Sequence, residues 1–226
     1  MNKRNNREHD FFNKLSEEWW DENGKFSVLH QIRPIRIQYI LDQLNRKNLK
    51  NLEILDLGCG GGLVCESLSR LGANVTGIDF VENNIKVAKI HSRKKKLSIN
   101  YLCRDIEKLK FNKKFDLIIM FEILEHLDNW ETFLIKIKKN LKRNGMVIIS
   151  TINRNIFSKY LAIYFAENIL RWIPKGTHDY NKFIKPKELE TVLQRENFKV
   201  NNFTGLVFNP IENIWKLNAN KTKINY

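Results

Sequence analysis

The stretch Glu53-Ile-Leu-Asp-Leu-Gly-Cys-Gly-Gly-Gly-Leu-Val-Cys-Glu66 decides the fold. It begins with an apolar run, Ile54 to Leu57, which is interrupted only by Asp56 and is typical of a buried strand in a parallel sheet. Glycine then fills four of the next five positions, and a helical pattern runs from Leu63 to Leu71. Strand, glycine turn and helix in this order direct backbone N–H groups and a helix N-terminus at a ligand. Glycine is needed there because a Cβ would hold the backbone away from the ligand or forbid the dihedral angles of the turn.

A second strand supports this interpretation, because Asn74 to Asp79 ends in a carboxylate. Asp79 follows Gly58 at about the 20-residue spacing at which an acid binds ribose hydroxyls. A glycine loop alone is a weak signal, since several nucleotide sites share it. The order Asp56-Leu-Gly-Cys-Gly-Gly-Gly62 differs from Gly-x-Gly-x-x-Gly and resembles motif I of the class I methyltransferases that use S-adenosylmethionine. The alternatives are a NAD site and an α/β turn without a ligand.

Strands and helices alternate along the rest of the chain. This alternation predicts an α/β fold with a doubly wound, mostly parallel sheet and the ligand at its carboxyl edge. We expect one domain over residues 1–226, with N-terminal helices and an insertion at 155–176. The expected helices are 10–20, 35–44 (with Pro34 at its start), 81–93, 130–141 and 186–196; the expected strands are 99–102, 115–121, 146–150 and 199–203, with a turn at 142–145.

The formal net charge of +14 predicts attraction to a polyanion, either nucleic acid or an anionic membrane surface. A blander cause is the heavy use of lysine and asparagine along the whole chain. The three cysteines contain no Cys-x-x-Cys pair, and an odd number of cysteines without a recognisable signal peptide predicts reduced thiols and a cytoplasmic location. No stretch approaches the ~20 apolar residues of a membrane span, so we expect a protein that does not cross the membrane.

Two further groups of polar residues follow predicted strands. Asp105, with Ile106 beside it, suits contact with an adenine ring, although a loop cap is the alternative. Glu122, Glu125 and His126 have i, i+3 and i+4 spacing, so a helical turn would place them on one face. Such a set could hold a divalent metal, or it could act as a general base with its orienting acid. An ordinary polar loop is the simplest alternative.

Several segments of the chain resemble the ubiquinone-biosynthesis O-methyltransferase family. The resemblance runs from about Phe11 to the C-terminus, and its most specific parts are Pro174-Lys-Gly-Thr-His-Asp179 and Ser150-Thr-Ile-Asn-Arg-Asn155. The other matching segments are Phe26-Ser-Val-Leu-His-Gln-Ile-Arg-Pro-Ile-Arg36, Leu55-Asp-Leu-Gly-Cys-Gly-Gly-Gly62, Glu122-Ile-Leu-Glu-His126, Lys182-Phe-Ile-Lys-Pro186 and Thr204-Gly-Leu-Val-Phe-Asn-Pro210.

The resemblance implies two O-methylations of polyprenyl catechol or quinol intermediates. By motif position it implies cofactor contacts from Arg36, Gly58 with Gly60, Asp79 and Phe121. It also implies Mg²⁺ held by Glu122, Glu125 and His126, with proton removal by His126 or a neighbouring carboxylate. Phe121 departs from the small or flexible residue expected there. The competing functions are an RNA methyltransferase and a cofactor-binding scaffold without activity.

The insertion, residues 155–176, mixes aromatic and aliphatic residues with Lys159, Arg171 and Lys175. It suits an amphipathic helix lying in a membrane interface, where Trp172 and the tyrosines would be favoured. The alternative is a lid packed on the protein's own core. We therefore expect peripheral association with the inner membrane and an anionic lipid surface as partner. An assembly of ubiquinone-biosynthesis proteins is a further expected partner, and no nucleic acid is expected.

Overall fold

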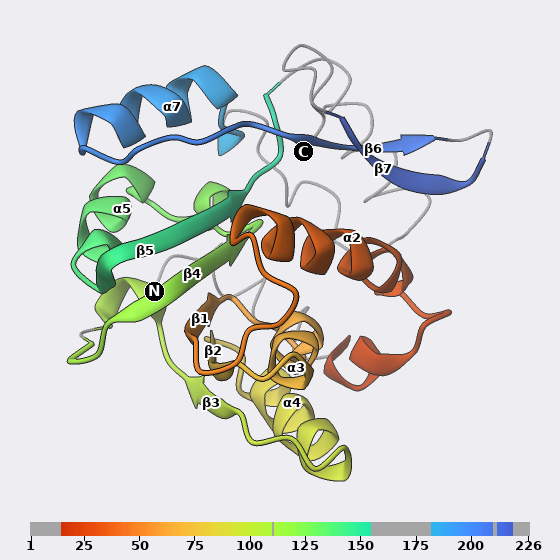
Figure 1. The fold of residues 1–226 in the computed structure, drawn as a ribbon. Helices are drawn as coiled ribbons and strands as arrows, with labels where there is room; N and C mark the ends of the chain where they lie inside the picture. Colours follow the sequence, from red (N-terminus) through yellow and green to blue (C-terminus); the bar gives the residue numbers. More distant parts are fainter. Residues whose placement is uncertain (1–14, 110, 155–181, 210–211, 219–226) are drawn as a thin grey trace. The chain divides into compact units, whose positions relative to one another are not determined.

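The computed structural model describes residues 15–109, 111–154, 182–209 and 212–218 (Figure 1). Its described residues form two compact units. The first contains the chain up to Phe121 together with Lys139–Ile149, and the second contains Glu122–Lys138 and the chain from Ser150 onward. The single domain expected for residues 1–226 stays a prediction.

The first unit is built on a sheet whose strand order is β3-β2-β1-β4-β5. Strand β1 pairs in parallel with both β2 and β4, and β2 pairs in parallel with β3. The strand order reverses between β1 and β4, so the predicted doubly wound class is confirmed. Leu57 lies opposite Met120, which brings the next residues, Gly58 and Phe121, to the same edge beside this reversal. Ligands of doubly wound folds bind there. The strands are β1 (Glu53–Leu57), β2 (Asn74–Asp79), β3 (Asn100–Cys103), β4 (Phe115–Phe121) and β5 (Leu141–Ser150).

Helices pack on this sheet through a core of aliphatic side chains. Ile54, Leu117 and Ile119 of the sheet share one buried cluster with Leu68 of α3 and Ala88 of α4. All five are fully buried, which is the arrangement expected of strands with near-continuous apolar sequence. The helices of this unit are η1 (Ser16–Trp20, a 3-10 helix), α2 (Ser27–Gln43), α3 (Leu63–Arg70), α4 (Glu82–Lys94) and η2 (Ile106–Lys108, a 3-10 helix).

Helix α2 corrects one prediction. The sequence predicted a helix that starts at Pro34, but α2 already begins at Ser27 and contains Pro34 in its interior. Proline lacks the N–H that would bond to the carbonyl of His30, so the helix loses one backbone hydrogen bond there. Ile32 lies before the proline and Ile40 lies after it, and both are buried, so apolar packing stabilises the helix on both sides of Pro34.

Strand β5 corrects a second prediction, because the expected turn at 142–145 is part of one strand, Leu141–Ser150. Gly145 was taken as a turn residue. A Cβ at this position would lie 2.9 Å from the Phe115 carbonyl oxygen, so glycine permits a close approach of backbone here. Lys142 extends from the same strand and pairs with Asp116 at 2.7 Å.

The second unit carries η3 (Leu124–His126, a 3-10 helix), α5 (Trp130–Lys138), α7 (Pro186–Arg195) and an antiparallel hairpin of β6 (Gly205–Asn209) and β7 (Ile214–Asn218). Helix α7 confirms its prediction and has proline in its first turn. The strand expected at 199–203 is wrong, since β6 begins only at Gly205. Within the described ranges, no helix is both long enough and apolar enough to cross a bilayer. The insertion at 155–176 lies outside the described residues.

Candidate functional site

The glycine loop after β1 is tied to the end of β2. The N–H groups of Gly58 and Cys59 both donate to the Ile78 carbonyl, at 2.7 and 2.9 Å. Gly58, Gly60 and Gly62 have φ values of 74°, 52° and 86°, in the left-handed region that favours glycine. Gly62 then forms the N-terminal cap position of α3. The predicted strand, turn and helix are therefore confirmed, and the reason for glycine at these three positions is backbone conformation.

Asp79 at the end of β2 is bound directly to this loop. Its Oδ2 accepts the N–H of Gly60 at 2.9 Å. Its Oδ1 accepts the N–H of Val81 at 2.8 Å and the side-chain amide of Asn84 at 3.3 Å. The carboxylate is buried, with 7% of the residue exposed. The structure thus joins the two parts that the sequence singled out, the glycine loop and the acid of the second strand, and the ribose contact of Asp79 stays a prediction.

Asp105 and Ile106 lie at the start of η2, after β3. The Asp105 side chain accepts the Glu107 N–H at 3.0 Å and pairs with Lys108 at 3.3 Å. These contacts match the loop-cap alternative. The predicted contact of Asp105 and Ile106 with adenine is tested by nothing in the described geometry and stays a prediction.

Arg36 of α2 reaches Phe121, the last residue of β4. Its guanidinium carbon lies 4.5 Å from the centre of the Phe121 ring, a cation–π distance. Two residues predicted to contact the cofactor are therefore in contact with each other, beside the reversal in strand order.

Asp56 was noted in the sequence as part of the glycine motif but was given no role of its own. It is buried in β1 just before the loop and accepts the Cys65 thiol at 3.1 Å. Burial raises the pKa of Asp56 to about 7, against the opposing effects of the Cys65 hydrogen bond and the Arg36 charge. Burial also raises the pKa of the Cys59 thiol to about 11, which makes this loop cysteine a poor nucleophile. The signal was available in the sequence, since Asp56 alone interrupts the apolar run of β1.

In the second unit, Glu122, Glu125 and His126 do not form the predicted helical face. Glu122 has φ of 52°, in the left-handed region, and η3 covers only Leu124–His126. The prediction of one shared face is therefore wrong for Glu122. A positive φ at a glutamate is a strained conformation of the kind that concentrates at functional sites.

The last residue of β5 and the two residues after it bind both glutamates. Ser150 donates its hydroxyl to Glu122, Thr151 donates its hydroxyl to Glu125 at 3.2 Å, and the Ile152 N–H donates to Glu125 at 3.4 Å. Glu125 is buried, with 4% exposed. Burial raises the pKa of Glu125, while the neighbouring His126 lowers it and Glu122 raises it further. The sequence had marked Ser150 to Asn155 only as part of a family resemblance, so the contacts of Ser150 and Thr151 with the glutamates were missed.

The predicted Mg²⁺ site is not supported by the described residues. Among them, no group of three His, Cys, Asp or Glu side chains is arranged to hold a metal ion. The carboxylates of Glu122 and Glu125 bind hydroxyl and backbone N–H donors, as described above. Binding of Mg²⁺ by Glu122, Glu125 and His126 is therefore not supported, and no step of the proposed reaction is assigned to a metal.

Comparison with known proteins gives consistent results. A family model described as a methyltransferase domain matches residues 55–149. The chain is 45% identical to the ubiquinone biosynthesis O-methyltransferase of Pelagibacter ubique, with 100% of this chain and 97% of that protein covered. It is 42% identical to the protein of the same name from Rickettsia prowazekii, with 100% and 90% covered. A crystal structure of magnesium protoporphyrin IX methyltransferase from Synechocystis with bound S-adenosylmethionine is similar at a TM-score of 0.67, with 17% identity and 92% of each chain covered. That structural likeness shows the fold alone.

Proposed function

Because the chain belongs to the ubiquinone biosynthesis O-methyltransferase family, we propose that it methylates phenolic hydroxyls of polyprenyl catechol and demethylubiquinol intermediates. The methyl donor is S-adenosylmethionine, and both O-methylation steps of the pathway are assigned to this one site. The observation that carries the proposal is 45% identity over the full length of the chain.

Two features of the first unit support the binding of a sulfonium nucleoside. Its glycine loop has the backbone conformation described above, and Asp79 lies against it through the Gly60 N–H. Carboxylates that follow the second strand of such folds bind ribose hydroxyls. The residues assigned to the cofactor are Arg36, Gly58, Gly60, Asp79, Asp105, Ile106 and Phe121.

The chemistry requires a deprotonated oxygen, because the methyl group of a sulfonium is already activated. A free phenol has a pKa near ~10, so little of it is ionised at neutral pH. We assign proton removal to His126, which would accept the hydroxyl proton while the oxygen attacks the methyl carbon and the sulfur leaves as a neutral thioether. Glu125, which is buried and directly precedes His126 in the sequence, would stabilise the resulting imidazolium. Alignment of oxygen, carbon and sulfur can supply about 7–11 kcal/mol of effective concentration.

A membrane role is part of the proposal. A polyprenyl tail would stay in the bilayer while the ring reaches the enzyme, and the apolar and aromatic residues of 155–176 suit an interfacial position. The net charge of +14 supports attraction to anionic lipids. Co-sedimentation with anionic and neutral vesicles measures this binding. Equal binding by the intact protein and a folded Phe165→Asp, Leu170→Asp variant would assign the contact to another part of the chain.

Labelled S-adenosylmethionine tests the reaction itself. We expect label transfer to a short-chain catechol analogue and none to total RNA, with the His126→Gln variant as the control for background transfer. Label in RNA and not in the catechol would favour the nucleic-acid methyltransferase instead. A chelator in the catechol arm measures dependence on Mg²⁺, which the family resemblance predicts and the described carboxylates do not support.

A further inference from the structure

Trp19 lies directly across the glycine loop. A Cβ on Gly60 would lie 2.4 Å from Cη2 of Trp19, and a Cβ on Gly61 would lie 2.3 Å from its Cγ. Real Cβ atoms do not approach other atoms so closely, so the indole fits only against glycine at these two positions. The reasons expected from the sequence for these glycines were the approach of a ligand and the dihedral angles of the turn. The structure adds a further reason, the close packing of a tryptophan from the N-terminal 3-10 helix η1.

The indole of Trp19 is also linked to the acid of the site. Its Nε1–H donates to Oδ1 of Asn84 at 2.8 Å, and the Asn84 amide donates to Asp79 at 3.3 Å. Asp79 in turn accepts the Gly60 N–H at 2.9 Å. Loop, acid, amide and indole thus form a closed ring of contacts. Trp19 and Asn84 are 8% and 2% exposed, so water competes little for these bonds.

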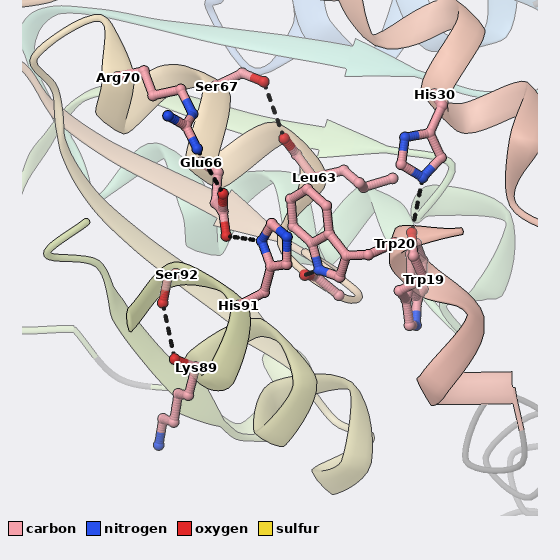
Figure 2. A network of polar contacts seen from close by, with 11 residues as sticks. Trp19, Trp20, His30, Leu63, Glu66, Ser67, Arg70, Lys89, His91 and Ser92 are labelled. Atoms are coloured by element: carbon pink, nitrogen blue, oxygen red, sulfur yellow. Dashed lines mark hydrogen bonds and ion pairs between the residues drawn. The ribbon is translucent and has the colours of Figure 1, made fainter. Parts of the chain in front are cut away.

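The second tryptophan of η1, Trp20, contacts the same glycine loop. Its Nε1–H donates to the Gly61 carbonyl at 3.1 Å. Its ring stacks on His91, with ring centres 3.4 Å apart and planes 11° apart. His91 Nδ1–H donates at 2.7 Å to Glu66, a buried residue of α3 (Figure 2). The position of Trp20 is therefore fixed by α3 and α4, the two helices that follow the glycine loop and the Asp79 strand.

Asn84 and His91, the α4 residues that contact Trp19 and Trp20, have a spacing that lets one helix bind both tryptophans. Asn84 and His91 are seven residues apart, which is two helical turns, so both lie on one face of α4. That face meets Trp19 at Asn84 and Trp20 at His91. His30 of α2 adds a hydrogen bond from Nε2–H to the Trp19 carbonyl at 2.9 Å, which fixes the backbone of η1 (Figure 2).

We propose that Trp19 and Trp20 are positioning residues of the cofactor site. Trp19 sets the distance between the glycine loop and Asp79, and Trp20 fixes the orientation of the Gly61 peptide. The inference rests on the proposed function, because it takes this loop and Asp79 as the binding site for S-adenosylmethionine. A purely structural role in the buried cluster of Leu15, Trp19, Phe26 and Leu63 is the competing interpretation.

Single substitutions separate the two interpretations. Trp19→Phe and Trp20→Phe each keep an aromatic ring and remove an N–H donor, whereas Leu15→Ala removes packing from the same cluster and keeps both indoles. Trp130→Phe, in the second unit, is the matched tryptophan control. Calorimetry with S-adenosylhomocysteine gives Kd, and assays with a short-chain catechol give KM for the cofactor and kcat.

Loss of one buried hydrogen bond corresponds to about a tenfold change in an equilibrium constant. We expect Trp19→Phe to raise Kd and KM about tenfold and Trp20→Phe about threefold to tenfold, with kcat within about twofold. Leu15→Ala should lower Tm and leave KM within twofold, and Trp130→Phe should leave all values unchanged. Unchanged KM in both Phe variants, or an equal rise in the Leu15→Ala protein, would overturn the positioning role.

A second variant keeps the test valid if Trp19→Phe does not fold. Asn84→Leu breaks the link between Trp19 and Asp79 from α4 and leaves both indoles in place. We expect a similar rise in KM, and no more than a twofold further rise when Trp19→Phe is added, because both changes break one ring of contacts. Multiplicative effects of the two changes would contradict the proposal. Native protein that binds no S-adenosylhomocysteine would instead refute the proposed function.

Discussion

Asp79 and Glu125 are both buried acids near functional segments, yet their surroundings differ. Asp79 accepts two backbone N–H groups at 2.9 and 2.8 Å and a side-chain amide at 3.3 Å. Glu125 accepts the Thr151 hydroxyl at 3.2 Å and the Ile152 N–H at 3.4 Å, and burial raises its pKa. Short bonds from backbone donors stabilise a carboxylate in place, whereas weak compensation of a buried acid suits proton chemistry. The difference is consistent with the roles proposed above, which are cofactor binding for Asp79 and proton transfer for the region of Glu125.

The largest expected effect comes from the second region. His126→Gln should lower kcat by about 10²–10⁴-fold, the range for loss of a general base, with little change in the Kd of S-adenosylhomocysteine. Rate measurements with a short-chain catechol check the fall in kcat, and calorimetry on the same protein checks the unchanged Kd. Activity within tenfold of the native value would remove His126 from the mechanism and weaken the contrast between the two regions.

The opposite pattern is expected for Asp79→Ala. This change should weaken cofactor binding by about 1.5–3 kcal/mol, as for a hydrogen bond to a charged group. It should also lower Tm, because the N–H groups of Gly60 and Val81 lose their acceptor. Asp42→Ala on α2, an exposed aspartate, is the control for loss of one negative charge. Unchanged cofactor affinity in a folded Asp79→Ala protein would refute the ribose assignment.

The sequence predicted the first region better than the second, for physical reasons. The glycine loop, Asp79 and the order of strand, turn and helix depend on local backbone rules and a fixed spacing, which can be read directly. Glu122 was misplaced because its left-handed backbone is incompatible with the helical periodicity that the spacing implied. The packing of Trp19 on Gly60 and Gly61 joins segments about 40 residues apart, and no local pattern announces such a contact.

The two wrong predictions at Gly145 and Pro34 have the same origin. Gly145 was interpreted as a turn, since glycine punctuates many turns. It lies within β5, where the Phe115 carbonyl comes too close for a Cβ. Pro34 was interpreted as a helix start, but burial of Ile32 and Ile40 outweighs the loss of one hydrogen bond. In both cases a long-range contact overrides a local preference that is otherwise informative.

Asp56 provides a pH test of the first region. Its pKa is raised to about 7 by burial, so the folded state binds a proton more tightly than the unfolded state, where the pKa is 3.8. Its contribution to stability is therefore fully present below pH 3.8 and is lost as pH rises through about 7. Between pH 5 and pH 8, we expect this group to lower the free energy of unfolding by on the order of 2 kcal/mol.

Chemical denaturation across this pH range measures the effect, with Asp56→Asn as the matched variant. Asparagine keeps an oxygen that can accept the Cys65 thiol but cannot ionise. The variant should therefore show a flatter stability profile than the native protein. Parallel profiles would mean that Asp56 does not titrate in this range.

The smallest expected effect lies where the two regions meet in sequence, at Phe121, the residue before Glu122. The Arg36 guanidinium lies 4.5 Å from the Phe121 ring centre, and partly exposed contacts of this kind contribute about 0.5–1 kcal/mol. Phe121→Leu keeps an apolar side chain and removes the ring, so it should lower the free energy of unfolding by about 1 kcal/mol.

A double-mutant cycle with Arg36→Met isolates the interaction between Arg36 and Phe121, and we expect a coupling of about 0.5–1 kcal/mol. Phe111→Leu, a part-buried phenylalanine that stacks edge-on with Phe115, is the control for loss of an aromatic ring. Coupling below about 0.3 kcal/mol would show that the ring and the guanidinium contribute to stability independently.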